Sequence, residues 1–315
     1  MTSAVPPPGV SIADARLQEV GDGVFAYIQP DGTWWINNTG FLTGPQGVIS
    51  IDACSTEDRT RAYQQAIATV TPAPVRAVVN THHHGDHTFG NCLFPGAAIV
   101  AQERARAEAI AFGPPRELPF WDHPDWGDLE LDPPFITFTD DIAVHAGDLR
   151  VQVRHVGTAA HTTNDSIVWI PERSVLFCGD LVFNGGTPFL LMGSVAGAIE
   201  VLEQVIVPLA AQTTVPGHGP VFSGQAPVEA TLDYCRFVLD VAARARQAGL
   251  SPLRAAQETD LGRFADWLDA ERIVGNLHRA CAELAGVPRG GPIDVPAALA
   301  DMVAYNGGAP LSCLA

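Results

Sequence analysis

The sequence has 315 residues, of which 47% are hydrophobic, and this is enough for a large buried core. Its formal net charge is −17, from 35 acidic and 18 basic side chains, and the absence of a basic run argues against a nucleic-acid partner. No apolar run is long enough to cross a bilayer and no secretory signal opens the chain. We therefore expect a cytoplasmic protein, not a membrane protein, whose six scattered cysteines are reduced.

Three segments are expected along the chain. Residues 1–16, with Pro6-Pro7-Pro8 at their centre, are predicted to be a disordered arm. Residues 17–225 alternate short apolar strands with helices and are predicted to form one α/β domain. Residues 226–315 carry apolar side chains at helical spacing and are predicted to form a helical extension packed on that domain.

The α/β domain is predicted to open with an antiparallel meander and to continue with helices between strands. Pro30-Asp31-Gly32 is a turn between two early strands. Ser55 is a good N-cap for a helix from Thr56 to about Val70. The strands predicted in this half are Val24–Ile28, Trp34–Ile36, Gly40–Thr43, Val48–Ile51, Val75–Val79 and Ala97–Ala101, and a second helix is predicted at Glu103–Ala111.

A second meander repeats this plan without a close sequence repeat. Gly147-Asp148 marks a hairpin turn within it, and Ser194 can cap a helix that runs to about Ile206. The predicted strands are Ile136–Phe138, Ile142–His145, Val151–Val156, Ser166–Ile170, Ser174–Phe177 and Thr213–Val215, and the predicted helices of the tail are Val228–Ala248, Leu253–Glu258, Leu261–Leu268, Ala270–Leu284 and Val295–Tyr305.

Between the two halves lies an irregular segment, Phe112–Phe135, that contains six prolines. Long irregular segments in compact domains are often lids or binding loops. A packed structural loop over helix ends is an equal alternative. The aromatic side chains of the segment, Phe120, Trp121 and Trp126, would suit a flat, apolar substrate.

The densest chemical signal follows the strand that ends at Val79. It reads His82-His83-His84-Gly85-Asp86-His87, a His-x-His-x-Asp-His pattern. The spacing of His82 and His84 lets two imidazoles point the same way on an extended backbone. Imidazoles and a carboxylate at such short spacing are typical of zinc sites and are hard to explain as ordinary surface or core.

Three further candidates, His161, Asp180 and His218, stand in loops after strands beside glycine or small residues. Together with the first cluster they make a seven-residue set for two metal ions. Two zinc ions are predicted, with manganese and iron as alternatives, and such a pair would make hydroxide available near neutral pH. The predicted catalytic residues are Asp86 and Asp180. The predicted metal ligands are His82, His84 and His161 at the first ion, Asp86, His87 and His218 at the second, and Asp180 as the bridge.

Other residues near these positions are given different roles. Asp52 ends its own strand and is predicted to orient a ligand imidazole. His83 is out of phase with its neighbours and is expected to point away from the metals. Cys54 and Cys178 do not fit the ligand pattern and are interpreted as packing residues. Three more histidines, His145, His155 and His278, are interpreted as structural.

With these motifs the chain resembles the metallo-β-lactamase superfamily. The resemblance rests on Thr81–His87, His161, Gly179-Asp180 and Gly217-His218-Gly219, and it covers roughly Leu17–Phe222. It implies an αββα sandwich with a dinuclear site at one edge, so that residues 17–225 would be the catalytic domain. Asp180 stands where some true β-lactamases have a zinc-binding cysteine, which favours hydrolases of the glyoxalase II or lactonase kind.

A narrower resemblance is to the zinc-dependent ring cyclases of aromatic type II polyketide pathways. It rests on stretches that extend into the helical tail. It implies an aldol ring closure of a polyketide held on acyl carrier protein, followed by thioester hydrolysis, with apolar walls formed by Phe112–Phe135 and Phe183–Met192. The stretches are Trp126–Leu131, Thr187–Phe189, Gly193–Gly197, Leu268–Arg272 and Val303–Gly308.

Two other functions stay open. One is a plain hydrolase of the same fold that acts on a lactone, a β-lactam or a glutathione thioester; the other is a redox protein with a di-iron centre, which the lack of a flavin domain disfavours. Arg104, Arg106 and Arg116 could supply a dock for the carrier protein, although ordinary solvated arginines are the simpler interpretation. The helical tail could cap the pocket, mediate a homodimer or complete the core.

Overall fold

A computed structural model of the chain describes residues 11–315. Residues 1–10 of the predicted arm lie outside the described residues. A 3-10 turn at Ile12–Asp14 and strand β1 (Arg16–Gly21) place regular structure before the predicted boundary at residue 17.

The strands form two sheets. The first has seven strands in sequence order, antiparallel from β1 to β4 and parallel from β4 to β7. The second has five strands in the order β12-β11-β10-β9-β8, and only its β11–β12 pair is parallel. The remaining strands are β2 (Val24–Ile28), β3 (Thr39–Gly44), β4 (Gly47–Ile51), β5 (Val75–Val79), β6 (Ala98–Gln102), β7 (Ile136–Phe138), β8 (Asp141–Ala146), β9 (Leu149–His155), β10 (Ser166–Ile170), β11 (Val175–Phe177) and β12 (Thr213–Val215).

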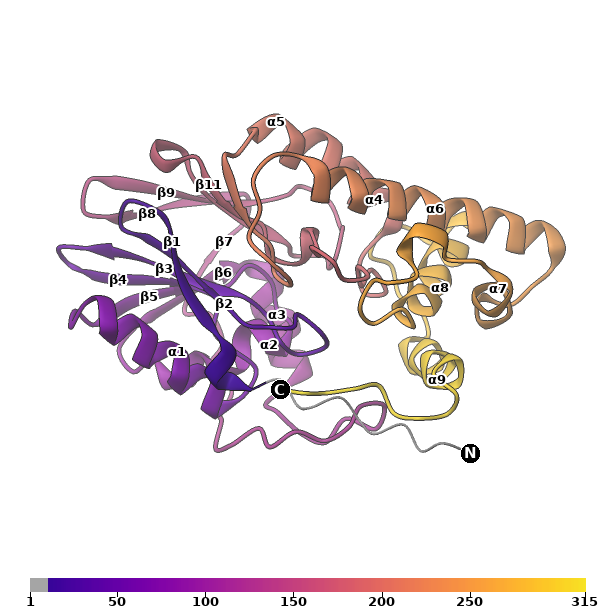
Figure 1. Ribbon diagram of the computed structural model, residues 1–315, viewed down its shortest axis with the longest axis horizontal. Coiled ribbons are helices and arrows are strands. Elements are labelled where there is room, and N and C mark those ends of the chain that lie inside the picture. The colour runs from indigo at the N-terminus through magenta and orange to yellow at the C-terminus, as the bar shows by residue number, and fades with distance from the viewer. Residues whose placement is uncertain (1–10) are drawn as a thin grey trace.

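Helices cover the outer face of each sheet, so the domain has the predicted αββα layers (Figure 1). One hydrophobic cluster, which includes Leu42 and Val153, fills the space between the sheets. A second joins the first sheet to α1 through Tyr63, and a third joins the second sheet to the later helices. The helices are α1 (Glu57–Val70), α2 (Gly85–Thr88), α3 (Glu103–Phe112), α4 (Val195–Val201), α5 (Val207–Leu209), α6 (Ala226–Ala248), α7 (Pro252–Glu258), α8 (Arg272–Leu284) and α9 (Val295–Tyr305).

Two predicted strands are placed differently by the structure. Residues Trp34–Ile36 form a turn, with Trp35 at a φ of 68°, because both tryptophans pack on the same side against other aromatic rings. Strand β7 belongs to the first sheet, where it pairs parallel with β6, and not to the second meander. Its parallel pairing needs a long connection from α3, and Phe112–Phe135 provides it.

Three helix predictions also change. Thr56, not Ser55, is the N-cap of α1, and its hydroxyl accepts from the Arg59 amide. Ser194 caps α4 as predicted, but the helix continues from Val201 as a π-helical turn at Leu202–Ile206 before α5. The predicted helix Leu261–Leu268 is only a 3-10 turn at Gly262–Phe264. The backbone of Leu268 bonds instead to Gly185 and Thr187, so the segment lies against that loop.

The helical tail shares its core with the α/β domain. Leu191 and Val195 pack in the same cluster as Val238 and Ile273 from α6 and α8. After α9 the chain runs back toward the first sheet (Figure 1). Within residues 11–315, no helix combines the length and the apolar character that crossing a bilayer requires.

Candidate metal centre

The seven predicted ligands come from four loops that follow strands at one edge of the sandwich. The segment after β5, which includes α2, supplies four of them, and single residues follow β9, β11 and β12. The structure brings all seven together as two groups that share Asp180. The first group is His82, His84, His161 and Asp180, and the second is Asp86, His87, Asp180 and His218.

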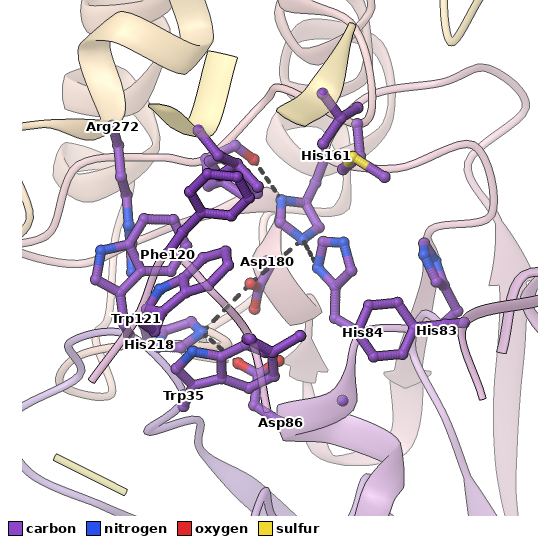
Figure 2. Close-up of a pocket in the computed structure, with 18 of the residues that line it drawn as sticks. Trp35, His83, His84, Asp86, Phe120, Trp121, His161, Asp180, His218 and Arg272 are labelled. Carbon is purple, nitrogen blue, oxygen red and sulfur yellow. Dashed lines mark hydrogen bonds and ion pairs between the residues drawn. The ribbon is translucent and has the colours of Figure 1, made fainter. Parts of the chain in front are cut away.

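The first group converges on His161. Its Nε2 atom lies 2.8 Å from Nδ1 of His84 and 3.2 Å from Nε2 of His82 (Figure 2). Its other nitrogen, Nδ1, donates to the carbonyl oxygen of Phe189 at 2.6 Å. With Nδ1 protonated, Nε2 of His161 presents a lone pair to the other two imidazoles. A cation between them accounts for this approach.

In the second group, Nε2 of His218 lies 3.3 Å from Oδ2 of both Asp86 and Asp180. Nε2 of His87 lies 3.1 Å from Oδ1 of Asp180. His218 donates from Nδ1 to the carbonyl oxygen of Gly32, which orients its ring. Oδ2 of Asp180 also lies 3.4 Å from Nε2 of His161 in the first group, so this carboxylate contacts both groups, as a bridging ligand requires.

Two observations fit a metal pair at this place. His87 Nε2 and Asp180 Oδ1 are buried and lie 3.1 Å apart, yet neither has a partner with hydrogen-bond geometry among the described residues, although such atoms are normally satisfied. Gly217 leaves room for the bridging carboxylate, because a Cβ atom there would lie 1.9 Å from Asp180 Oδ1. The donor set of imidazoles and carboxylates suits zinc, manganese or iron.

The proton affinities of the two groups differ. Burial lowers the pKa of His82 and of His84 well below the usual value, so both rings are neutral and can act as ligands. Burial alone would also lower the pKa of His218, but the carboxylates of Asp180 and Asp86 outweigh it and raise that pKa to about 9. A metal ion bound to His218 would displace this proton.

Asp52 has the predicted position behind the ligands. It accepts from Nδ1 of His87 at 2.8 Å and from the hydroxyl of Thr81 at 2.8 Å. Cys54 and Cys178 are buried free thiols outside both groups, as predicted.

The remaining histidines lie outside the two groups. His83 points away from the ligands (Figure 2). Its ring contacts Asn164, and its Nε2 lies 3.3 Å from Oε2 of Glu108. This agrees with its predicted orientation. His278 pairs with Asp301, and His155 accepts from the amide of Gly157.

A pocket with a cavity volume of about 220 Å³ opens directly over the metal groups. The two segments expected to wall it do so: Phe112–Phe135 contributes Phe120 and Trp121, and Phe183–Met192 contributes three apolar side chains. The lining is Trp34, Trp35, His83, His84, Gly85, Asp86, Phe112, Leu118, Pro119, Phe120, Trp121, His161, Asp180, Phe183, Phe189, Met192, His218, Arg272, Val295 and Leu299.

Sequence reasoning missed several of these residues. Trp34 and Trp35 were assigned to a strand, and Arg272 was given no role. The Arg272 guanidinium is buried, pairs with Asp269 at 2.7 Å and lies 4.0 Å above the ring of Trp34. With Val295 and Leu299 it shows that the tail caps the pocket. The Trp34-Trp35 doublet itself was the local signal that could have identified these two wall residues.

The α/β part of this chain is similar to known proteins. The family profile described as the Metallo-beta-lactamase superfamily matches residues 32–219. A hydroxyacylglutathione hydrolase from Rhodospirillum rubrum is 30% identical over 190 residues, which is 59% of this chain and 63% of that protein. The alpha subunit of a 2,4-dinitroanisole O-demethylase from a Nocardioides species is 26% identical over 174 residues, 55% of this chain and 45% of that protein.

Among solved structures, a metallo-beta-lactamase from Pontibacter korlensis superposes with a TM-score of 0.57 and 20% identity. The match covers 71% of this chain and 99% of that one. Because the identity is only 20%, the match supports the fold alone. The chain spans less than two thirds of the length of the curated relatives described above.

Proposed function

Because the chain belongs to the metallo-beta-lactamase superfamily, we propose that it is a dinuclear metal-dependent hydrolase that cleaves a thioester with a large, apolar acyl group. One observation carries this proposal: the two ligand groups that share Asp180 form the floor of a pocket whose walls are largely aromatic. Fold alone would leave the substrate open, because one fold hosts many reactions.

The ligand set supports hydrolysis. Two zinc ions held by it would supply an activated water and polarise the scissile carbonyl. The chain's own contribution is to hold that centre rigidly, since His161 and His218 are each oriented by a backbone carbonyl and His87 by Asp52. The apolar walls exclude bulk water and so strengthen every electrostatic interaction at the floor.

The relatives support a thioester as the substrate. Several of them are named hydroxyacylglutathione hydrolases, and an acylglutathione is a thioester. The walls support a large apolar acyl group, because tryptophan and phenylalanine rings line the cavity and, apart from the metal ligands, its only polar side chains are His83 and Arg272. Arg272, the one arginine in the lining, is already paired with Asp269 and is poorly placed to bind a peptide carboxylate.

A second candidate is the ring cyclase with thioesterase activity that the sequence resembles. The size of the aromatic pocket favours it, because a flat bicyclic polyketide would fit against the walls formed by Phe112–Phe135 and Phe183–Met192. The acyl carrier protein would dock near α3. There Arg104 and Arg116 are exposed, and Arg116 stacks 4.6 Å from the centre of the Phe112 ring at the pocket wall.

The test is a paired assay on protein whose metal content has been measured. A bicyclic aromatic polyketide thioester is supplied, and thiol release and ring closure are both followed by mass spectrometry. Asp180→Ala removes the shared ligand and should abolish both. The matched control is Asp148→Ala, the same substitution at an exposed hairpin turn, which should behave as the wild type.

Each outcome selects one function. Thiol release without ring closure supports the hydrolase, and a new cyclised product that is lost in Asp180→Ala supports the cyclase. If nitrocefin or simple lactones are cleaved and no thioester is, both thioester proposals are wrong.

A further inference from the structure

The aromatic wall formed by Phe120 and Trp121 has little regular structure of its own. Among the described residues, the backbone of residues 113–125 makes hydrogen bonds to a distant part of the chain at one place only. The amide of Leu311 donates to the carbonyl oxygen of Phe120 at 2.8 Å, and the amide of Asp122 donates to the carbonyl oxygen of Leu311 at 2.9 Å. The two segments thus pair like short parallel strands at Trp121 and Leu311.

Residues 311–314, here called the strap, are themselves anchored. The Leu311 side chain is fully buried in the cluster that also holds α6 and α8. Three residues later, Nη2 of Arg59 donates to the carbonyl oxygen of Leu314 at 2.8 Å. Arg59 lies on α1 beneath the first sheet and is buried. The strap therefore connects the wall both to the helical tail and to the α/β domain.

The wall that the strap holds also packs on other aromatic side chains of the pocket. The Trp121 ring packs edge-on against Trp34 at 5.4 Å and against Trp35 at 5.7 Å between ring centres, and all three line the cavity. The metal ligands, in contrast, follow strands of the two sheets, and among the described residues no hydrogen bond or ion pair joins them to the strap. Displacing the strap would move the wall without moving the ligands.

We infer that Leu311 is a positioning residue for substrate selectivity: the strap holds Phe120 and Trp121 where they bind a flat aromatic acyl group. The kinetic test of this inference rests on the proposed thioester hydrolysis, because it compares kcat/KM for two thioester substrates. A large aromatic acyl group needs the ordered wall of Phe120 and Trp121. An acetyl group can reach the metal ligands at the base of the pocket without contacting that wall. The strap should therefore set the ratio of the two activities and leave the activity on the small substrate unchanged.

The experiment compares Leu311→Pro, which lacks the N–H that bonds to Phe120, with the matched control Ala309→Pro. Ala309 is exposed and makes no backbone bond to the wall. Holoenzymes are assayed with the 2-naphthoyl and acetyl thioesters of N-acetylcysteamine. Hydrogen exchange of residues 113–125 is measured by mass spectrometry, and Leu311→Ala, which keeps both backbone bonds, serves if the proline variant does not fold.

We expect Leu311→Pro to lower kcat/KM for the naphthoyl substrate at least tenfold, mainly through KM, and to change kcat/KM for the acetyl substrate less than twofold. Exchange should rise in residues 113–125 only, metal content should be unchanged, and Ala309→Pro should match the wild type. Leu311→Ala, by removing buried side-chain contacts, should shift the ratio in the same direction by a smaller factor. Equal losses on both substrates, or faster exchange with an unchanged ratio, would overturn the inference.

A failure of the proposed function is recognised separately. If the wild type hydrolyses neither thioester, binding of 2-naphthoate and of acetate to the same variants is measured by calorimetry. Naphthoate affinity that falls at least tenfold in Leu311→Pro would still support the strap. Equal affinity in wild type and variant would refute it whatever the reaction is.

Discussion

Oδ2 of Asp52 lies 2.8 Å from Nδ1 of His87, and both residues are buried. The same oxygen accepts from the hydroxyl of Thr81, whose oxygen lies 3.1 Å from Nδ1 of His82. His82 belongs to one ligand group and His87 to the other. A single carboxylate thus orients an imidazole in each half of the metal centre.

Replacing Asp52 with Asn should weaken both halves. The amide keeps the shape of the carboxylate but loses the charge that supports the Nδ1 proton of His87. Loss of a partner that orients a ligand imidazole typically lowers metal affinity about 10- to 100-fold. Competition with a chromophoric chelator measures the loss. Asp141→Asn, at an exposed position of β8, is the control, and equal affinities for the two variants would contradict the role of Asp52.

Gly217→Ala should remove the bridge between the metals. Its Cβ would lie 1.9 Å from Asp180 Oδ1, so the carboxylate must leave its position. Metal analysis should find less than two equivalents bound, with hydrolysis reduced by about two orders of magnitude because the electrostatic centre is lost. Gly186→Ala is the matched control, since a Cβ there meets only ordinary contacts at 3.9 Å. A fully loaded Gly217→Ala protein would show that the bridge tolerates the methyl group.

Removing the metals should destabilise the protein, and protons should compete with them. At a free zinc concentration about 1000 times the dissociation constant, binding contributes about 4 kcal/mol to stability. Chelation should therefore lower Tm by several degrees, and added zinc should restore it.

Protons should compete with zinc at His218, because the pKa of this residue is about 9 without metal and only the neutral ring can bind zinc. Zinc affinity should therefore rise with pH up to about 9. Calorimetry in two buffers that differ in ionisation enthalpy would detect the released protons, and a flat pH profile would contradict the prediction.

Asp269 should make stability depend on pH between about 4 and 6. Burial raises its pKa to about 6, although the neighbouring Arg272 opposes the shift. Because the folded pKa lies above the unfolded value, the native state binds this proton more tightly. The stabilisation is fully present below about pH 4 and is lost as the pH rises through about 6, with a total of about 3 kcal/mol.

Urea unfolding of wild type and Asp269→Asn at several pH values tests this. As the pH rises from 4 to 7, the free energy of unfolding of the wild type should fall relative to that of Asp269→Asn. Metal effects cancel in this comparison, because both proteins keep the same ligands. The exposed neighbour Asp266 provides the control variant Asp266→Asn, and parallel profiles for Asp269→Asn and wild type would rule the titration out.

Local sequence was sufficient to predict most strands and to identify the ligand candidates, and the resemblance to the metallo-β-lactamase superfamily implied the layers. Apolar runs with turn residues between them located nearly all strands, because strand formation depends on short-range patterning. The ligands could be predicted because four of them stand within six residues, His82–His87, and the other three follow strands beside glycine or small residues. In the structure β5, β9, β11 and β12 end at one edge of the sandwich, and this brings the ligand segments together.

The walls of the pocket depended on contacts between distant residues. Trp34 was predicted to lie in a strand, yet its indole N–H donates to Glu271, 237 positions away, and the chain turns to allow it. Arg272 reaches the pocket only because α8 packs against the 183–189 loop, and Trp121 is held by Leu311 from the far end of the chain. No local pattern encodes such pairings, since they form only when separate segments share one core. The sequence by itself therefore determined the metal-binding chemistry, and the tertiary structure decided the shape of the space in which that chemistry acts.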